Sequence, residues 1–169
     1  MDKRIISLAP VLSAHPKVLI LGSMPSRISL EKQQYYANTR NHFWNILYTL
    51  FQIAPIESYD EKIQFVRKRH LALWDSIGSC YREGSLDANI EDETPNDIPA
   101  LLKMYPSISL IACNGTKSYQ TFMKYFSVDI DIDIKKLPST SPIPGRYTKS
   151  FEGKVADWKV ILDYIENDA

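Results

Sequence analysis

The chain is poor in cysteine, has no long hydrophobic run and carries no excess of charge of either sign. Its two cysteines, Cys80 and Cys113, lie far apart and lack the spacing of a zinc or iron–sulfur site. No apolar run approaches the roughly 20 residues that span a bilayer, and the first residues lack the small-residue cleavage pattern of a secretory signal. We therefore expect a reduced, cytoplasmic protein without a membrane segment, a metal or a cofactor.

The charges balance, with 20 basic and 20 acidic residues in a chain of 169. This balance excludes a bulk polycation but is compatible with a local basic patch that meets DNA on one face. Charges scattered only for solubility are the alternative interpretation. The basic residues in expected loops or at helix starts are Arg27, Lys32, Arg40, Lys117, Arg146 and Lys149.

Hydrophobic patterning predicts one domain over residues 1–169, in which short strands alternate with helices. Two of the expected strands are continuously apolar, as in strands covered on both faces. This order predicts an α/β fold, a three-layer α/β/α sandwich around a short central, mostly parallel sheet. Strands are expected at 18–21, 71–74, 108–112 and 130–137, and helices at 43–51, from about 60, and at 98–105, 119–126 and 155–165.

Ligands of such folds bind beyond the carboxyl ends of the strands. The segments expected there are 22–27, 75–82, 113–118 and 138–147, and all are rich in Gly, Pro, Ser, Asn or Arg. The first contains Gly22-Ser23-Met24-Pro25-Ser26, where glycine allows a close backbone approach and proline stiffens the turn. It is neither a P-loop nor a GxGxxG motif. A plain strand-to-loop turn is therefore the alternative.

Polar and aromatic residues precede the expected helix that starts at Phe43-Trp44. Asn41 is suited to cap this helix, since asparagine accepts helix N–H groups well. The functional alternative is that its carboxamide orients a water molecule or polarises a bound base. Tyr35 and Tyr36 lie in a polar, Gln-rich loop, which favours a ring available for base stacking over a purely core role.

Two further segments follow expected strands. Asn114 is either a turn residue or a group that reads a flipped base through its paired donor and acceptor. The segment 137–146 contains three prolines and three hydroxyl side chains, so it is neither a helix nor a central strand. Its rigidity suits a loop that grips phosphate or wedges into a groove, and an ordinary surface loop is the alternative.

The segment after Trp74 contains several charged residues. We interpret Asp75 as structural and leave the role of Arg82 open. His15, His42 and His70 show neither metal nor triad spacing, and no serine lies in a G-x-S-x-G motif. The pattern does not favour a protease or a classical hydrolase.

In chain order, five segments resemble the uracil-DNA glycosylase superfamily, and more narrowly its hypoxanthine-DNA (deoxyinosine) glycosylase branch. They are GSMPSRISL, QQYYANTRNHFW, LWDSIGSCYREGSLDANI, CNGTKSYQTF and LPSTSP, and they cover about residues 17–147. The resemblance implies Asn41 as the catalytic residue, with Asn38 as a near competitor. It also implies a base-binding pocket made by Gly22, Ser23, Met24, Pro25, Tyr36, Phe43 and Asn114, and a DNA-binding loop made by Ser139, Thr140, Ser141, Pro142 and Arg146.

The sequence departs from the superfamily pattern in both signature motifs. Many members place a catalytic Asp or Asn in the first turn, where this chain has Ser23 and Met24. The second motif usually begins with His, but here the loop reads Pro138-Ser139-Thr140-Ser141. No imidazole is then available to stabilise a departing base. We expect slow chemistry on uracil and greater activity on purines, whose N7 accepts a proton.

The resemblance implies a monofunctional glycosylase that hydrolyses the N-glycosidic bond of a deaminated base, hypoxanthine being favoured, and leaves an abasic site. The base must first leave the stack of duplex DNA. We expect a monomer without cofactor or metal that is nucleoid-associated when it acts on DNA. The alternatives are a uracil- or mismatch-directed glycosylase, a catalytically silent DNA-binding module, and a domain that acts on free nucleosides.

Overall fold

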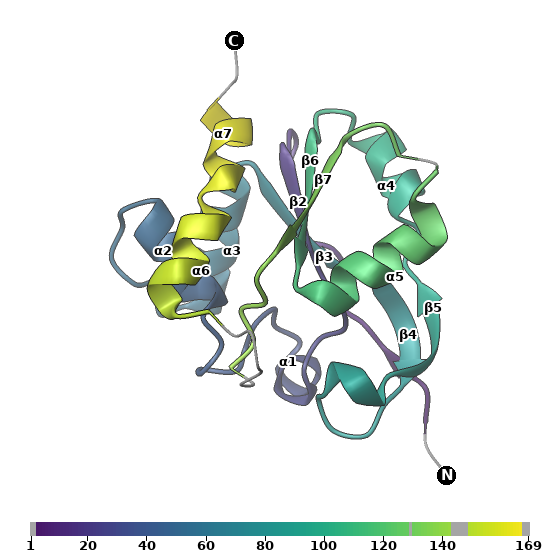
Figure 1. Cartoon of the computed structure of the whole chain (residues 1–169). Helices are drawn as coiled ribbons and strands as arrows, with labels where there is room; N and C mark the ends of the chain where they lie inside the picture. Colours follow the sequence, from purple (N-terminus) through teal and green to yellow (C-terminus); the bar gives the residue numbers. More distant parts are fainter. Residues whose placement is uncertain (1–2, 129, 143–148, 167–169) are drawn as a thin grey trace.

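The centre of the fold is a parallel sheet in the order β3-β2-β6-β7. The computed structural model describes residues 3–128, 130–142 and 149–166 (Figure 1). All three strand pairs of this sheet are parallel, so the carboxyl ends of the strands meet at one edge. The strands are β2 (Val18–Gly22), β3 (Leu71–Asp75), β6 (Leu110–Asn114) and β7 (Asp133–Leu137).

Helices cover both faces of this sheet, which confirms the expected three-layer α/β/α sandwich (Figure 1). On β2, Val18 and Ile20 pack toward one helical layer, while Leu19 and Leu21 pack toward the other. Every residue of β2 and β6 is buried, as the continuous apolar runs predicted. One layer contains α2 (Phe43–Leu50), α3 (Tyr59–Lys68), α6 (Phe151–Trp158) and α7 (Val160–Glu166), and the other contains α4 (Ile98–Met104) and α5 (Thr116–Phe126).

Polar side chains start several of these helices. Ser58, Asp97 and Ser150 each accept a hydrogen bond from a backbone N–H in the first turn of α3, α4 and α6, respectively. Pro99 lies in the first turn of α4, where the missing N–H costs nothing. These caps fix where the helices begin relative to the strands before them.

A second, smaller sheet has the order β1-β4-β5 and is antiparallel. It was not predicted, and the interpretation of residues 75–82 as a loop is wrong in part, because a strand occupies most of that range. The pattern is hard to recognise, since β4 reads IGSCY and β5 is largely charged. The strands are β1 (Ile5–Ile6), β4 (Ile77–Tyr81) and β5 (Glu91–Pro95), with a short 3₁₀ helix, η1 (Asp87–Asn89), before β5.

Other elements also differ from the prediction: β6 spans Leu110–Asn114 rather than 108–112, and α6 begins at Phe151 rather than at 155. Strand β7 begins at Asp133 rather than at 130. The helix expected over 155–165 is interrupted at Lys159, where the N–H of Leu162 bonds to the carbonyl only three residues back. A short helix, α1 (Arg27–Lys32), follows the first turn and is capped by Ser26. Over the described ranges, no helix is long and apolar enough to cross a membrane.

Candidate active site

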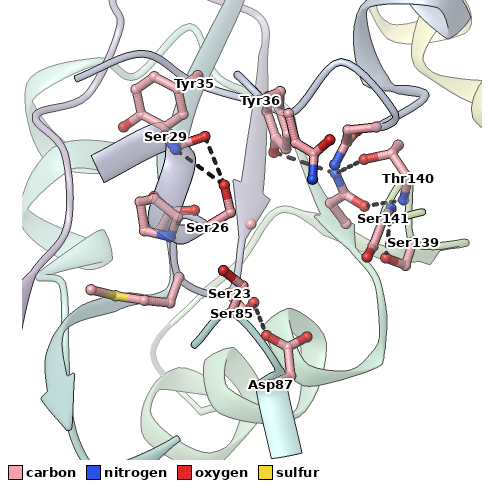
Figure 2. Close-up of a pocket in the computed structure, with 17 residues that line it drawn as sticks. Ser23, Ser26, Ser29, Tyr35, Tyr36, Ser85, Asp87, Ser139, Thr140 and Ser141 are labelled. Atoms are coloured by element: carbon pink, nitrogen blue, oxygen red, sulfur yellow. Dashed lines mark hydrogen bonds between the residues drawn. The ribbon is translucent and has the colours of Figure 1, made fainter. Parts of the chain in front are cut away.

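A pocket lies at the carboxyl edge of the parallel sheet, where the strand ends converge (Figure 2). Its volume is about 110 Å³, several times the roughly 10–15 Å³ that one buried water requires. Four strand ends or the loops that follow them contribute to it, as the parallel register requires. The lining residues are Gly22, Ser23, Met24, Pro25, Ser26, Ser29, Tyr35, Tyr36, Asn38, Asn41, Asp75, Ser85, Asp87, Asn114, Ser139, Thr140 and Ser141.

The turn after β2 is held from outside by the segment that follows β3. The Gly22 carbonyl accepts the N–H of Ser76 at 2.8 Å, and Arg82 Nη2 donates to the Pro25 carbonyl at 2.7 Å. Ser23 Oγ donates to Asp87 Oδ1 at 2.7 Å, a contact visible in Figure 2. The turn is therefore a fixed wall of the pocket rather than a free loop, and Arg82, whose role was open, acts on it as a structural support.

Asp75 ends β3 directly beside Gly22 of β2 in the parallel register. Its side chain is only 3% exposed, yet it lines the pocket. A Cβ built on Gly22 would lie 2.4 Å from Asp75 Oδ1, so glycine is the residue that leaves room for the carboxyl group here. Burial raises the pKa of Asp75 to about 7, against a lowering by Arg82, and Asp87 adds to the rise. The purely structural interpretation of Asp75 does not account for its place in the pocket.

Tyr36 lines the pocket, as does its aromatic neighbour Tyr35. Tyr36 is the less buried of the two. Its backbone has a φ of 54°, a left-handed conformation that is strained for a bulky side chain. The ring stacks on Phe43 with centroids 3.8 Å apart. Phe43 itself is fully buried and does not line the pocket, which corrects its expected role in base binding. Phe43 acts on the pocket only through the ring it supports.

Asn114 ends β6 and ties the last loop to the sheet. Its Oδ1 accepts the N–H of Thr140 at 2.9 Å, while Nδ2 donates to Thr140 Oγ1 at 3.0 Å and to the Tyr36 hydroxyl at 3.3 Å. The carboxamide was expected to read a flipped base. In the structure these atoms bond to Thr140 and Tyr36, so Asn114 holds the loop and the Tyr36 hydroxyl while it lines the pocket.

Asn41 lies at the pocket and also shapes the start of α2. Its Oδ1 accepts the N–H of Phe43 at 2.8 Å, so the capping alternative is realised as a local turn. Within the described part of the chain Nδ2 has no hydrogen-bond partner and is left for a ligand or water. Asn38 also lines the pocket, but its Oδ1 accepts the N–H of Arg40 at 3.0 Å.

Hydrogen bonds from several elements hold the loop after β7. The Thr140 carbonyl accepts the N–H of His42 at 3.0 Å, and Trp158 Nε1 donates to the Pro138 carbonyl at 2.9 Å. Lys154 Nζ lies 3.3 Å from His42 Nδ1 beneath the loop. Burial lowers the pKa of His42, with a second lowering by Lys154. The loop's inner face is thus fixed by α2 and α6.

The predicted loop residues fall in different places. Ser139, Thr140 and Ser141 line the pocket, although Thr140 is only 1% exposed and faces inward. Pro142 lies in a neighbouring groove that Asn38, Arg40 and Asn41 also line. Arg146 lies outside the described residues.

Sequence reasoning missed several pocket residues, namely Ser29, Asp75, Ser85 and Asp87. Asp75 had a usable signal, since it ends a predicted strand at the same edge as Gly22. Ser85 and Asp87 reach the pocket through the segment after β4, which the pattern did not reveal. Among the described residues, no group of three or more His, Cys, Asp or Glu side chains is arranged to hold a metal ion.

The structure is a parallel sheet between helical layers, with a pocket at its carboxyl edge that a Gly-Ser-Met-Pro-Ser turn and a Pro/Ser loop form in part, which is where such folds bind their ligands. The family model described as the uracil DNA glycosylase superfamily matches residues 9–162. The chain belongs to the uracil DNA glycosylase superfamily.

Relatives with a curated description are named hypoxanthine DNA glycosylase. One, from Methanosarcina acetivorans, is 34% identical over 155 residues, which is 90% of this chain and 94% of the relative. Another, from Methanosarcina barkeri, is 30% identical over 152 residues, with 88% and 92% covered. A solution NMR structure from M. acetivorans, described provisionally as a uracil DNA glycosylase, superposes with a TM-score of 0.80 at 31% identity and covers 98% of this chain and 100% of that one.

Proposed function

We propose that the protein is a DNA glycosylase that hydrolyses the N-glycosidic bond of hypoxanthine in DNA and leaves an abasic site. The observation that carries the base preference is the match to two relatives named hypoxanthine DNA glycosylase along about 90% of the chain. The pocket supports the reaction class. It is a cavity at the carboxyl edge of the sheet, lined largely by residues with polar side chains and suited to a planar base that has left the duplex.

Asn41 is the proposed catalytic residue. Cleavage of the glycosidic bond passes through a sugar with oxocarbenium character, so a positioned water does more than a strong nucleophile. The Oδ1 atom of Asn41 is fixed by the N–H of Phe43, and this bond holds the carboxamide in one orientation. Asn41 lines the pocket in this orientation, and Oδ1 retains a second lone pair for the water. Asn38 is the competing carboxamide.

We assign roles to the other residues of the site from their positions. The ring of Tyr36, backed by Phe43, stacks on the base. The turn made by Gly22, Ser23, Met24 and Pro25 forms the wall against which the base lies. Asn114 contributes by holding Thr140 and Tyr36, and the loop 139–142 presses on the DNA beside the pocket, with Arg146 extending the contact.

We also propose the wider setting of this activity. Residues 1–169 form a single glycosylase domain that acts as a monomer on double-stranded DNA containing a damaged base. The reaction uses no cofactor, metal or covalent lysine intermediate, so the enzyme is monofunctional. It works in the cytoplasm and is nucleoid-associated while it acts on DNA.

A uracil-directed activity is the second candidate. It is favoured by the solved structure described provisionally as a uracil DNA glycosylase, which superposes over nearly the whole chain. Both bases are lactams and present a carbonyl oxygen beside an N–H. The choice between them therefore depends on the pocket's fit to one or two rings.

The test is single-turnover cleavage of matched duplexes that carry one hypoxanthine or one uracil, followed by alkali. We expect strand cleavage mainly at hypoxanthine. Asn41→Ala is expected to abolish it and to lower stability by about 1 kcal/mol through loss of the turn before α2. Asn41→Ser keeps an oxygen suited to capping but lacks the carboxamide. It should regain the stability without the activity.

Three results would change the proposal. Cleavage mainly at uracil would keep the superfamily and change the substrate. Cleavage that survives in both Asn41 variants would leave Asn41 as a helix-start residue only and direct the same test to Asn38→Ala. Binding of DNA without cleavage of either base would favour a silent binding module.

A further inference from the structure

The carboxyl group of Asp75 is buried at the pocket without the partners that a structural carboxylate has. Its Oδ2 atom is enclosed and has no hydrogen-bond partner among the described residues. Removing an unpaired ionised carboxylate from water is costly, so a structural Asp at this depth normally accepts N–H groups or pairs with a cation. Arg82 makes no hydrogen bond to it: Nε and Nη2 donate to the carbonyls of Gly84 and Pro25, and Nη1 is buried without a hydrogen-bond partner among the described residues.

The surroundings of Asp75 are arranged to keep it against the pocket. Gly22 leaves the space that its carboxyl group occupies, because a Cβ on residue 22 would lie 2.4 Å from Oδ1. The Tyr36 hydroxyl lies beside the same point, 3.4 Å from that Cβ position. This hydroxyl already accepts a hydrogen bond from Asn114 Nδ2. Asp75, Tyr36 and Asn114 therefore form one polar group of side chains at the pocket wall.

We propose that Asp75 is a catalytic residue that donates its proton to N7 of the flipped purine as the glycosidic bond breaks. This inference rests on the proposed function, since it requires a purine in the pocket. The C1′–N9 bond breaks with its electron pair going to the base, and the Asp75 O–H proton goes to N7. The base leaves as neutral hypoxanthine. Water adds to C1′ and releases a proton to solvent, from which Asp75 regains its own.

The electrostatics of the site support a protonated Asp75 near neutral pH. Burial raises its pKa to about 7, Arg82 opposes the rise, and Asp87 adds to it. The other titratable groups beside it are the hydroxyls of Tyr35 and Tyr36, whose pKa values burial raises and the charge of Asp75 raises further. Both stay neutral and leave Asp75 as the group that titrates. A general acid is most effective when its pKa lies near the working pH.

This assignment also explains how the chain manages without the superfamily's usual groups. The first turn offers Ser23 and Met24, and the loop after β7 offers Ser139 and Thr140. None of these residues is an acid that can neutralise a departing base. Asp75 reaches the same pocket from the adjacent strand, β3, and supplies the proton from there.

The first experiment measures single-turnover excision of hypoxanthine from pH 5.5 to 9 with the wild-type enzyme and Asp75→Asn. The wild-type rate should fall as pH rises through about 7. The asparagine variant, which donates hydrogen bonds but no proton, should be about 10²–10⁴-fold slower and should lose this dependence while still binding DNA. Asp163→Asn, an exposed change on α7, is the matched control and should retain the wild-type profile.

A second substrate tests the atom that receives the proton without any variant. DNA carrying 7-deazahypoxanthine has carbon in place of N7. Wild-type enzyme should cleave 7-deazahypoxanthine as slowly as Asp75→Asn cleaves hypoxanthine. The variant should cleave the two bases at the same rate. Equal wild-type rates on both substrates would overturn the proposal, as would an unchanged pH profile in Asp75→Asn or a rate that rises through pH 7. Absence of hypoxanthine excision by the wild type would instead refute the proposed function.

Discussion

At the scale of single residues, the position of Asp75 couples the stability of the protein to pH. Burial raises the pKa of its carboxyl group from the ordinary value of 3.8 to about 7. Because the folded state keeps the proton to higher pH, the stabilisation from this group is complete below pH 3.8 and is lost as pH rises to about 7. The difference between the two pKa values corresponds to about 4 kcal/mol.

Asp75→Asn removes this dependence, since the amide is neutral at every pH. We expect the variant to match the wild type in free energy of unfolding at pH 4 and to exceed it by about 3–4 kcal/mol at pH 8. Urea unfolding at the two pH values measures the difference. A gap of equal size at both would show that Asp75 is not buried in its neutral form. Greater stability together with lower activity is the pattern expected of a functional residue.

At the scale of elements, the bond between the end of β6 and the loop after β7 decides the shape of the pocket. Asn114 is 9% exposed and Thr140 1% exposed, so their hydrogen bonds are shielded from water. Asn114→Ala leaves the buried N–H of Thr140 unpaired, which costs about 1–3 kcal/mol. We expect that loss in urea unfolding, together with slower excision because Tyr36 also loses its partner.

Thr140→Val is the matched control for this bond. It removes the Oγ1 contact but leaves the N–H of residue 140 bonded to Asn114 Oδ1. Its cost should be about 1 kcal/mol, and excision should be affected less than in Asn114→Ala. If both variants lose the same activity, the contribution of Asn114 lies in the hydroxyl contact and not in holding the loop backbone.

The sequence predicted the layers and the main strands because they depend on local periodicity. The apolar runs of β2 and β6 and the stripes of α2 and α5 are visible without tertiary information. The antiparallel sheet was missed because β4 and β5 carry small and charged side chains instead of an apolar pattern. The two strands are recognised only by their pairing with each other in the folded protein. Pairing between distant segments leaves no periodic trace.

The same distinction holds for the pocket. The rule that ligands bind beyond the strand ends predicted which segments converge there. It could not predict which polar atoms are already used by the protein, as in Asn114, or which are left without a partner, as in Asp75. The resemblance placed Phe43 in the base-binding pocket, but its ring is buried against Trp158 and Tyr36 in the core. These outcomes depend on contacts between distant residues.

At the scale of the whole molecule, the parallel strands make the two edges of the sheet different, because all strands end at one edge and begin at the other. The pocket lies at the carboxyl edge of the strands, together with the groove that Arg40 lines. The helices that precede strands end at the opposite edge, as α4 does shortly before β6. We therefore expect a chain with no net charge to bind phosphate through the few cations at its pocket edge, with an affinity that depends on salt through few contacts.

Arg40→Ala tests this arrangement, since Arg40 is exposed and lines the groove beside Asn41 and Pro142. Each neutralised phosphate contributes about one unit to the slope of log affinity against log salt. We expect the variant to weaken binding of a hypoxanthine duplex and to reduce that slope by about 1, measured by fluorescence anisotropy at several salt concentrations. Lys103→Ala, an exposed change at the end of α4, should leave the slope unchanged. Equal slopes for both variants would place the DNA on another face, because only a cation near the bound backbone releases counterions when the duplex binds.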